Sequence, residues 1–327
     1  MTSDVAIIGA GMTGLSAARA LRTAGLSVAV VDKGRGVGGR LATRRIGDAR
    51  LDHGAQFFTV RGDDFRAMVD EAIDEGVVHV WSHGFSKDDG YPRYACAGGM
   101  TALAKWMSTE LLEAGALTLA TRIERLDHDG SHWHLHSDTE NVAHAPSMII
   151  TAPVPQTLEL FEASSLHLED DTRNSLQAMK YKPVLGLLLT LDAAPAIPAP
   201  GAIQASEDEH FTFVADNVAK GVSSTPAVTL HANGVVSAAR WDDPEAEVIN
   251  DFLELARPWI SDANVKEAEL KRWRYAGPVE PYPHRSLTAI DTPGTIVLGG
   301  DAFGGPKVEG AFNSGVACAQ AVLAQLS

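Results

Sequence analysis

A glycine-rich turn near the beginning of the chain constrains its fold more than any other feature. The apolar run Val5–Ile8 leads into Gly9-Ala10-Gly11-Met12-Thr13-Gly14, which is followed by a helical pattern and by a second apolar run that ends at Asp32. Strand, G-x-G-x-x-G turn, helix, strand and final acid in this order are typical of a βαβ unit that binds dinucleotides. Such a turn lets a diphosphate approach the backbone at Gly11 and the helix N-terminus. We therefore expect a dinucleotide site in which Asp32 holds a ribose.

A second glycine motif, Gly38-Gly39-Arg40, follows Asp32 within a few residues. A chain that bound only NAD would have no evident use for it. The motif resembles one in the FAD-dependent amine oxidase superfamily, in which this loop folds back over the same diphosphate and its arginine pairs with phosphate oxygens. The resemblance implies that FAD, not NAD, is the resident cofactor.

The C-terminal stretch VLGGDAFGGPKVEGAFNSGVACAQAV resembles the GD motif of the same superfamily. This likeness implies that Asp301 contacts the diphosphate and ribityl region, and that residues 308–311 begin a helix directed at the flavin pyrimidine ring. Cys96 and Cys318 lie outside the positions that covalent flavin links use, so we expect FAD to be bound noncovalently. The residues expected to bind the cofactor are Gly9, Gly11, Met12, Thr13, Gly14, Asp32, Lys33, Gly39, Arg40, Ile123, Asp301 and Val308.

These motifs predict an α/β fold with a Rossmann-type FAD-binding domain and an inserted mixed-sheet substrate domain, as in the topology of amine oxidases and p-hydroxybenzoate hydroxylase. The first domain is begun by the N-terminus and completed by a strand over 295–300 and a helix over 310–326. Further helices are predicted over 63–75, 100–114 and 244–259, a hairpin at Asp129-Gly130, and second-domain strands over 182–191, 211–215, 227–232 and 268–275. We expect residues 1–75, 97–152 and 278–327 to form the FAD-binding domain, and residues 76–96 and 153–277 the substrate domain.

Three further segments resemble the renalase family, particularly its bacterial members. They are LDHGAQFFT at 51–59, GGM at 98–100 and KRWRYAGP at 271–278. The likeness extends over essentially the whole chain. It implies an FAD-dependent oxidase that converts 2- and 6-dihydro-NAD(P) to NAD(P)⁺ by hydride transfer to flavin N5, with O₂ reduced to H₂O₂. The residues alone indicate only a flavin-binding fold.

The implied reaction requires little of the side chains, because losing a hydride makes the dihydropyridine ring aromatic without a general base. We therefore predict substrate-binding residues rather than a certain catalytic residue. They are Gln56, Phe57, Phe58, His231, Trp273 and Arg285. An aromatic side chain can stack on nicotinamide, and an arginine or a histidine can contact a carboxamide or a phosphate. Each also has a structural interpretation: Phe57 and Phe58 can be core residues, and His231 a core histidine with its hydrogen bonds satisfied.

Two other functions are compatible with the same motifs. One is a flavin amine oxidase or a desaturase-type dehydrogenase. Amine oxidases typically place a tyrosine beside the final EGA motif, and Pro306-Lys307-Val308 occupies that stretch here, which counts against this alternative. The other is a catalytically idle flavin- or nucleotide-binding sensor.

The composition of the chain limits the classes of molecule that we expect it to bind. The formal net charge of −15 argues against nucleic acid or an anionic membrane surface as the main partner. Two widely spaced cysteines and no long apolar segment favour a reducing, cytoplasmic location without a membrane span. His132, His134 and His136 alternate along one predicted strand, a pattern that we interpret as a solvated hairpin face and not as a metal site. The expected partners are a dihydronicotinamide dinucleotide and O₂, and the sequence leaves the oligomeric state open.

Overall fold

The computed structural model describes residues 1–85, 89–204 and 209–326. The chain folds into two compact units, each formed by segments that are separated in the sequence. The first unit comprises residues 1–39, 104–180 and 278–327, and the second comprises residues 40–103 and 181–277. This division differs from the predicted domains in three places, because residues 40–75 and 97–103 lie in the second unit and residues 153–180 lie in the first.

The first unit contains a six-stranded sheet in the order β17-β18-β11-β1-β2-β7. Its strands are β1 (Val5–Ile8), β2 (Val28–Val31), β7 (Leu117–Thr118), β11 (Ser147–Ile150), β17 (Leu287–Ile290) and β18 (Thr295–Leu298). Five of them run parallel, and β17 pairs antiparallel to β18 at the edge. The first strand therefore lies in one parallel sheet with a strand from the other end of the chain, as the sequence predicted.

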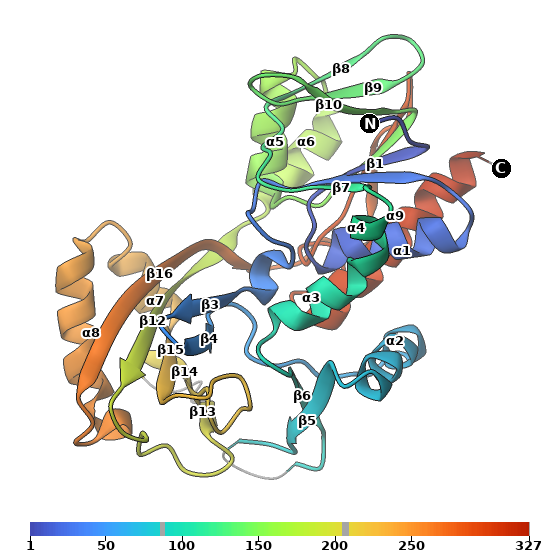
Figure 1. Ribbon diagram of the computed structural model, residues 1–327. Helices are drawn as coiled ribbons and strands as arrows, with labels where there is room; N and C mark the ends of the chain where they lie inside the picture. Colours follow the sequence, from blue (N-terminus) through green and yellow to red (C-terminus); the bar gives the residue numbers. More distant parts are fainter. Residues whose placement is uncertain (86–88, 205–208, 327) are drawn as a thin grey trace. The chain divides into compact units, whose positions relative to one another are not determined.

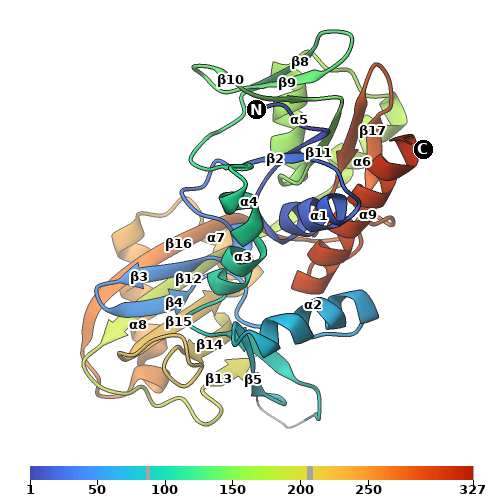
Figure 2. The same cartoon turned by 45° about the vertical axis from the view of Figure 1, so that its right-hand side comes forward.

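Two helices from opposite ends of the chain pack on each other beside this sheet, α1 (Met12–Thr23) and α9 (Val308–Leu326) (Figures 1 and 2). The Oγ of Ser16 donates a hydrogen bond to the backbone oxygen of Phe312 at 3.0 Å. A Cβ added to Gly315 would lie 2.0 Å from the Oγ of Ser16 and 2.1 Å from the backbone oxygen of Thr13. Only glycine therefore allows the two helices to approach this closely.

The remaining elements of the first unit are a three-stranded sheet and short helices. They are β8 (Arg125–His128), β9 (Trp133–His136), β10 (Asn141–Ala145), α4 (Thr109–Glu113), α5 (Val154–Ala163) and α6 (Asp170–Ala178). The antiparallel pairing of β8 with β9 confirms the predicted hairpin at Asp129-Gly130. Sequence patterns did not reveal α5 and α6, because Pro153 and Pro155 suggested only a change of direction. Pro155 is instead accommodated in the first turn of α5, where a helix needs no backbone N–H donor.

The second unit contains a five-stranded sheet in the order β13-β14-β15-β12-β16. Its strands are β12 (Tyr181–Leu191), β13 (Ala202–Gln204), β14 (Phe211–Asp216), β15 (Ala227–Ala232) and β16 (Val265–Pro278). The helix α8 (Glu245–Ile260) packs on this sheet (Figure 1). The buried residues Val248, Phe252, Ala256 and Ile260 recur every four positions along α8, which gives the helix one apolar face.

Shorter elements complete the second unit. They are the hairpin β3 (Thr43–Ile46) with β4 (Ala49–Asp52), the hairpin β5 (Val78–Ser82) with β6 (Arg93–Cys96), the helices α2 (Asp63–Asp74) and α7 (Gly234–Ala239), and the 3₁₀ turn Gly39–Leu41 at its boundary. The helix predicted over 100–114 is two helices, α3 (Thr101–Met107) and α4. The break falls at Ser108, whose Oγ donates to the backbone oxygen of Lys105 at 2.9 Å and so competes with the helical bonds.

The predicted fold class is confirmed: an α/β protein with a Rossmann-like unit and a second unit inserted in the sequence. Among the residues that the structure describes, no helix has both the length and the apolar composition required to span a bilayer.

Candidate functional site

The carboxyl ends of neighbouring parallel strands in the first unit bring the predicted nucleotide-binding segments together. Gly9 follows β1, Asp32 follows β2, and Asp301 stands three residues after the end of β18. Because β18, β11, β1 and β2 are adjacent and parallel, these segments meet at the same edge of the sheet. This edge is where open α/β sheets bind ligands.

The first glycine turn is shaped by close backbone approach. Gly9 has a φ of +110°, which L side chains rarely adopt. A Cβ on Gly14 would lie 1.8 Å from the backbone oxygen of Gly9, so no other residue would allow α1 to begin so close to β1. Both glycines therefore fix the position of the α1 N-terminus.

Gly11 has a different role, because its Cα faces open space. A Cβ added there would meet no described atom within 4 Å. Gly11 is also the N-cap of α1, and within the described part of the chain no side chain caps the helix and no acid stands in its first turn. No described side chain therefore competes with an anion for the first N–H groups of α1, and the space beside Gly11 fits a diphosphate.

The second glycine motif crosses the first. The backbone N–H of Gly38 donates to the backbone oxygen of Ala10 at 2.8 Å, and a Cβ on Gly39 would lie 3.6 Å from the Cα of Gly11. Gly39 has a φ of +54°. This contact between the two loops is what the resemblance implied for a chain that holds FAD.

Arg40, the next residue, belongs to the second unit. Its Nη1 donates to the backbone oxygen of Tyr275 at 3.0 Å, and its own backbone oxygen accepts from the N–H of Ala55 at 2.8 Å. The guanidinium is thus tethered to β16. Its contact with a phosphate stays a prediction.

Asp32 accepts backbone hydrogen bonds on both carboxylate oxygens, from Ala10 at 2.6 Å and from Gly34 at 2.6 Å. Each oxygen keeps a second lone pair, which a ribose hydroxyl can use. Beside it, Lys33 donates from Nζ to the Oε1 of Gln156 at 2.8 Å, and burial lowers the pKa of its ammonium group. Ile123 is 8 % exposed. It lies two residues after Thr121, whose backbone N–H donates to the backbone oxygen of Asp32 at 3.0 Å.

The C-terminal motif is also fixed by hydrogen bonds and by close backbone contacts at glycine. Asp301 is 8 % exposed, and the N–H of Gly300 before it donates to the Oγ of Ser314 in α9 at 2.9 Å. A Cβ on Gly310 would lie 2.3 Å from the backbone oxygen of Gly305, so the turn that leads into α9 requires glycine. Val308 is the first residue of α9.

The second unit holds a buried ion pair that sequence reasoning missed. The Nζ of Lys220 lies 2.7 Å from the Oδ2 of Asp52, and both side chains are 0 % exposed. The Oδ1 of Asp52 accepts from the N–H of Met100 at 2.8 Å and from the hydroxyl of Thr43. Lys220 also donates to the Oε1 of Gln56 at 3.2 Å, and burial lowers its pKa. The pair therefore anchors the turn after β4, which carries the DHGAQFF segment.

An aromatic stack follows this ion pair along the chain. The rings of His53 and Trp273 lie 5.3 Å apart at 21°. The backbone oxygen of His53 accepts from the Nε1 of Trp273 at 2.7 Å and from the Nε2 of His231 at 3.2 Å. Burial lowers the pKa of both histidines to about 4, so both imidazoles are neutral at pH 7.

The predicted substrate residues are distributed over both units. Gln56, His231 and Trp273 all contact residues 52–54, by hydrogen bonds within the second unit. Arg285 lies in the first unit, where its backbone oxygen accepts from Ser314 at 2.6 Å.

The two adjacent phenylalanines have different surroundings. Phe57 packs edge-on against Phe85 at 4.9 Å. Phe58 is 3 % exposed and packs between Tyr94 and Phe65. Its environment is that of a core residue, and a contact with substrate stays a prediction for both phenylalanines.

Two histidines of β9 pair with aspartates, and both cysteines are buried. On β9, His134 pairs with Asp129 at 2.8 Å and His136 with Asp127 at 2.6 Å. Over the described ranges, no group of three or more histidine, cysteine, aspartate or glutamate side chains is arranged to hold a metal ion. Cys96 and Cys318 are buried free thiols, and burial raises the pKa of each to about 12.

Sequence reasoning missed Lys220 and His53 for different reasons. Lys220 stands in a loop between strands without a recognisable motif, and its partner is far away in the sequence. His53 stands inside DHGAQFF, but that segment drew attention to its amide and aromatic residues. His53 could have been predicted from its position between Asp52 and Gly54 in the DHGAQFF segment.

Two family profiles match the chain. Residues 7–72 match a profile described as an NAD(P)-binding Rossmann-like domain, and residues 77–323 match one described as flavin containing amine oxidoreductase. A putrescine oxidase from Kocuria rosea is 41% identical over 68 residues, which is 21% of this chain and 14% of that protein.

Solved structures agree on the fold. A putrescine oxidase bound to putrescine superposes with a TM-score of 0.71 at 18% identity, covering 99% of both chains. A putative protoporphyrinogen oxidase from Exiguobacterium sp. 255-15 gives 0.73 at 13% identity, covering 98% of both chains. The cyclohexylamine oxidase from Brevibacterium oxydans IH-35A gives 0.67 at 15% identity, covering 99% of both.

Proposed function

We propose that this chain, which belongs to the flavin containing amine oxidoreductase family, is an oxidase of isomeric dihydronicotinamide dinucleotides, 2- and 6-dihydro-NAD(P). Its cofactor is FAD, as the sequence motifs predicted. Noncovalent binding is part of the proposal, supported by the burial of both cysteine thiols and by their raised pKa values. We further propose that the first unit supplies most FAD contacts and that the second supplies most substrate contacts.

Each group of residues has a task in this proposal. The uncapped N–H groups of α1 bind the diphosphate, and the carboxylate of Asp32 holds the adenosine ribose. Bound FAD supplies two-electron chemistry, namely hydride acceptance from the substrate and reoxidation by O₂ with formation of H₂O₂. Trp273 and His53 orient a planar nicotinamide ring. No side chain must remove a proton, because loss of a hydride leaves an aromatic pyridinium.

The observation that supports this substrate best is the stack of two flat rings, His53 and Trp273, beside a carboxylate that is already neutralised. Asp52 is the buried acid of the second unit among the described residues, and it is paired with Lys220. Glu269 on β16 contacts both Arg44 and Lys271. A cationic amine would gain little from acids so compensated, whereas the flat nicotinamide ring of a dinucleotide can stack on the two neutral rings.

The test is anaerobic mixing of the purified, FAD-loaded protein with 6-dihydro-NAD, with ordinary NADH, and with putrescine or cyclohexylamine. The visible absorbance of oxidised flavin is followed. We expect rapid bleaching with 6-dihydro-NAD alone, and formation of NAD⁺ with H₂O₂ once air is admitted. Bleaching by an amine and not by the dihydronicotinamide would contradict the proposal.

Amine oxidation is the second candidate, and the relatives are the observation that favours it. The putrescine oxidase shares sequence with part of this chain, and two amine oxidase structures share its fold. Against this stands Pro306-Lys307 before α9, where a tyrosine would be expected. If neither class of substrate bleaches the flavin, the sensor interpretation replaces both.

Trp273 provides a test of the proposed substrate site that leaves the FAD site intact. Trp273→Phe keeps a flat ring but removes the Nε1 donor to His53, and Trp273→Ala removes the ring as well. We expect Trp273→Ala to slow flavin reduction at least about tenfold, because stacking on nicotinamide is lost, and Trp273→Phe to slow it less. FAD content should stay that of the unmodified protein in both variants. Equal reduction rates in all three proteins would remove Trp273 from the substrate site.

A further inference from the structure

A cavity lies between α5 and α6 in the first unit. Its volume is about 400 Å³. The loop that joins the helices forms part of its wall and contains Ser165, which has a φ of +53°. Its apolar wall is formed by Leu158, Phe161, Leu166 and Leu168. The volume lies within the range of small-molecule sites.

Arg173 on α6 is the cationic group of this cavity. Its Nε is buried and has no hydrogen-bond partner in the described part of the protein. A guanidinium cannot lose its charge at neutral pH, so a buried N–H without an acceptor costs free energy. Several other arginines of the chain, among them Arg93 and Arg240, have carboxylate partners.

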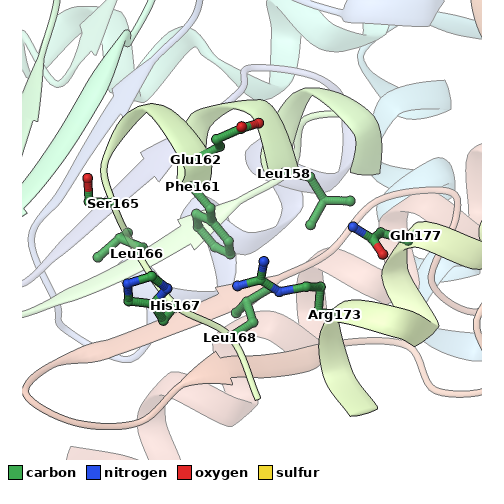
Figure 3. A pocket seen from close by; sticks show the side chains of 9 residues that line it. All are labelled: Leu158, Phe161, Glu162, Ser165, Leu166, His167, Leu168, Arg173 and Gln177. Atoms are coloured by element: carbon green, nitrogen blue, oxygen red, sulfur yellow. The ribbon is translucent and has the colours of Figure 1, made fainter. Parts of the chain in front are cut away.

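Figure 3 shows how the side chains are arranged around this group. The guanidinium of Arg173 points toward the ring of Phe161 and the imidazole of His167. The carboxylate of Glu162 and the hydroxyl of Ser165 point away from it. Glu162, the acid on the cavity wall, is exposed to solvent and forms no ion pair with Arg173 among the described residues. The cavity therefore combines an unpaired cation with an apolar wall.

We propose that this cavity binds a small amphipathic carboxylate, with its carboxylate on Arg173 and its hydrocarbon body against the leucines and Phe161. The two carboxylate oxygens can accept from the two terminal guanidinium nitrogens, which is a paired geometry that arginine favours. Burial of a short aliphatic chain against the apolar wall adds the hydrophobic contribution. The chain as a whole carries −15, so attraction of an anion here depends on this local cation.

The test uses the full-length, FAD-loaded protein and hexanoate as the probe, with binding measured by titration calorimetry and saturation-transfer NMR. Hexanol has a similar body without the charge, and inorganic phosphate has the charge without the body. We expect hexanoate to bind at least about tenfold more tightly than either, because it alone satisfies both the guanidinium and the wall.

Variants then locate the site. Arg173→Gln, a substitution that preserves helix propensity, should weaken hexanoate binding at least about tenfold. Arg173→Lys, which keeps the charge but loses the planar fork, should weaken it less. Arg125→Gln, at an exposed arginine of the same unit, should leave it unchanged. An unchanged hexanoate affinity in Arg173→Gln overturns the proposal, as does phosphate binding as tight as that of hexanoate or the absence of saturable hexanoate binding. None of these results depends on flavin reduction.

Discussion

At the scale of single residues, the glycine motif meets two requirements at two different positions. Gly14 allows close packing of the backbone, and Gly11 leaves space for a ligand. Gly14 is needed for packing, because its Cβ would overlap the backbone of Gly9. Gly11 faces open space, so an alanine there fits the folded chain but places a methyl group where a diphosphate would approach. The conformation alone does not require glycine at Gly11, which makes it a specific reporter of ligand binding.

We predict that Gly11→Ala folds normally and binds FAD at least about tenfold more weakly, equivalent to about 1.4 kcal/mol. FAD affinity is measured by titration of the flavin-free protein, and folding by thermal unfolding of the same sample. Gly234→Ala is the matched control, because a Cβ there also meets nothing closer than 4.0 Å. Equal FAD affinity in both variants would show that the diphosphate does not approach Gly11.

The ion pair between Asp52 and Lys220 leads to a second prediction at this scale. Lys220→Met leaves the carboxylate of Asp52 buried and without its cation, which should lower the free energy of unfolding by about 3–5 kcal/mol. Adding Asp52→Asn should restore much of the loss, because the amide oxygen can still accept from Met100. Urea denaturation measures both. Arg125→Met, which breaks an exposed pair with Asp127, should cost no more than about 1 kcal/mol. A Lys220→Met protein as stable as the parent would contradict the assigned role of the pair.

At the scale of elements, local sequence patterns predicted the turns, hairpins and helices whose formation depends on neighbouring residues. The glycine turn, the hairpin at Asp129-Gly130 and the helix α8 all have short-range signals, and each is present. Long-range features were missed, because Asp52 and Lys220 are far apart in the sequence and only the folded second unit brings them together. The predicted domain boundary at residue 153 differs from the division into compact units for a similar reason. Nothing in α5 or α6 indicates which unit they will pack on, and the packing of α5 against β8 decides it.

The close contact of α1 with α9 gives the prediction for this scale. An alanine at Gly315 would normally favour a helix, but here its methyl group would overlap Ser16 and the backbone of Thr13. We expect Gly315→Ala to push α1 away from α9, to lower stability by about 1–3 kcal/mol and to weaken FAD binding together with it. Gln320→Ala, at an exposed position of the same helix, is the control. A Gly315→Ala protein with higher stability than the parent would show that the two helices can separate without cost.

At the scale of the whole molecule, the pH dependence of stability follows from buried neutral histidines. The pKa of His53 and of His231 is lowered to about 4, whereas the pKa of a histidine in the unfolded chain is near 6.5. Between these values the unfolded chain binds more protons than the folded one. Stability is therefore complete above about pH 6.5 and is lost as the pH falls toward 4, by up to about 3 kcal/mol for each histidine.

The measurement is the free energy of urea unfolding as a function of pH. We expect His231→Gln to reduce the slope in this window by up to about 1.4 kcal/mol per pH unit, because one titrating group is removed. Gln320→Ala, at an exposed position without a titratable side chain, should leave the slope unchanged. An unaltered slope in His231→Gln would mean that this imidazole is protonated in the folded protein as readily as in the unfolded one.

The strand order of the first unit has a consequence for folding during translation. β11 lies between β1 and β18, so the second neighbour of β11 is not translated until Leu298, and α9 emerges later still. N-terminal segments commonly begin to fold during synthesis. Here such early folding can form only part of the sheet, and α9 is not yet present to cover its apolar face. The segment that carries the first glycine turn must therefore remain without part of its sheet and without its covering helix until β18 and α9 have been synthesised.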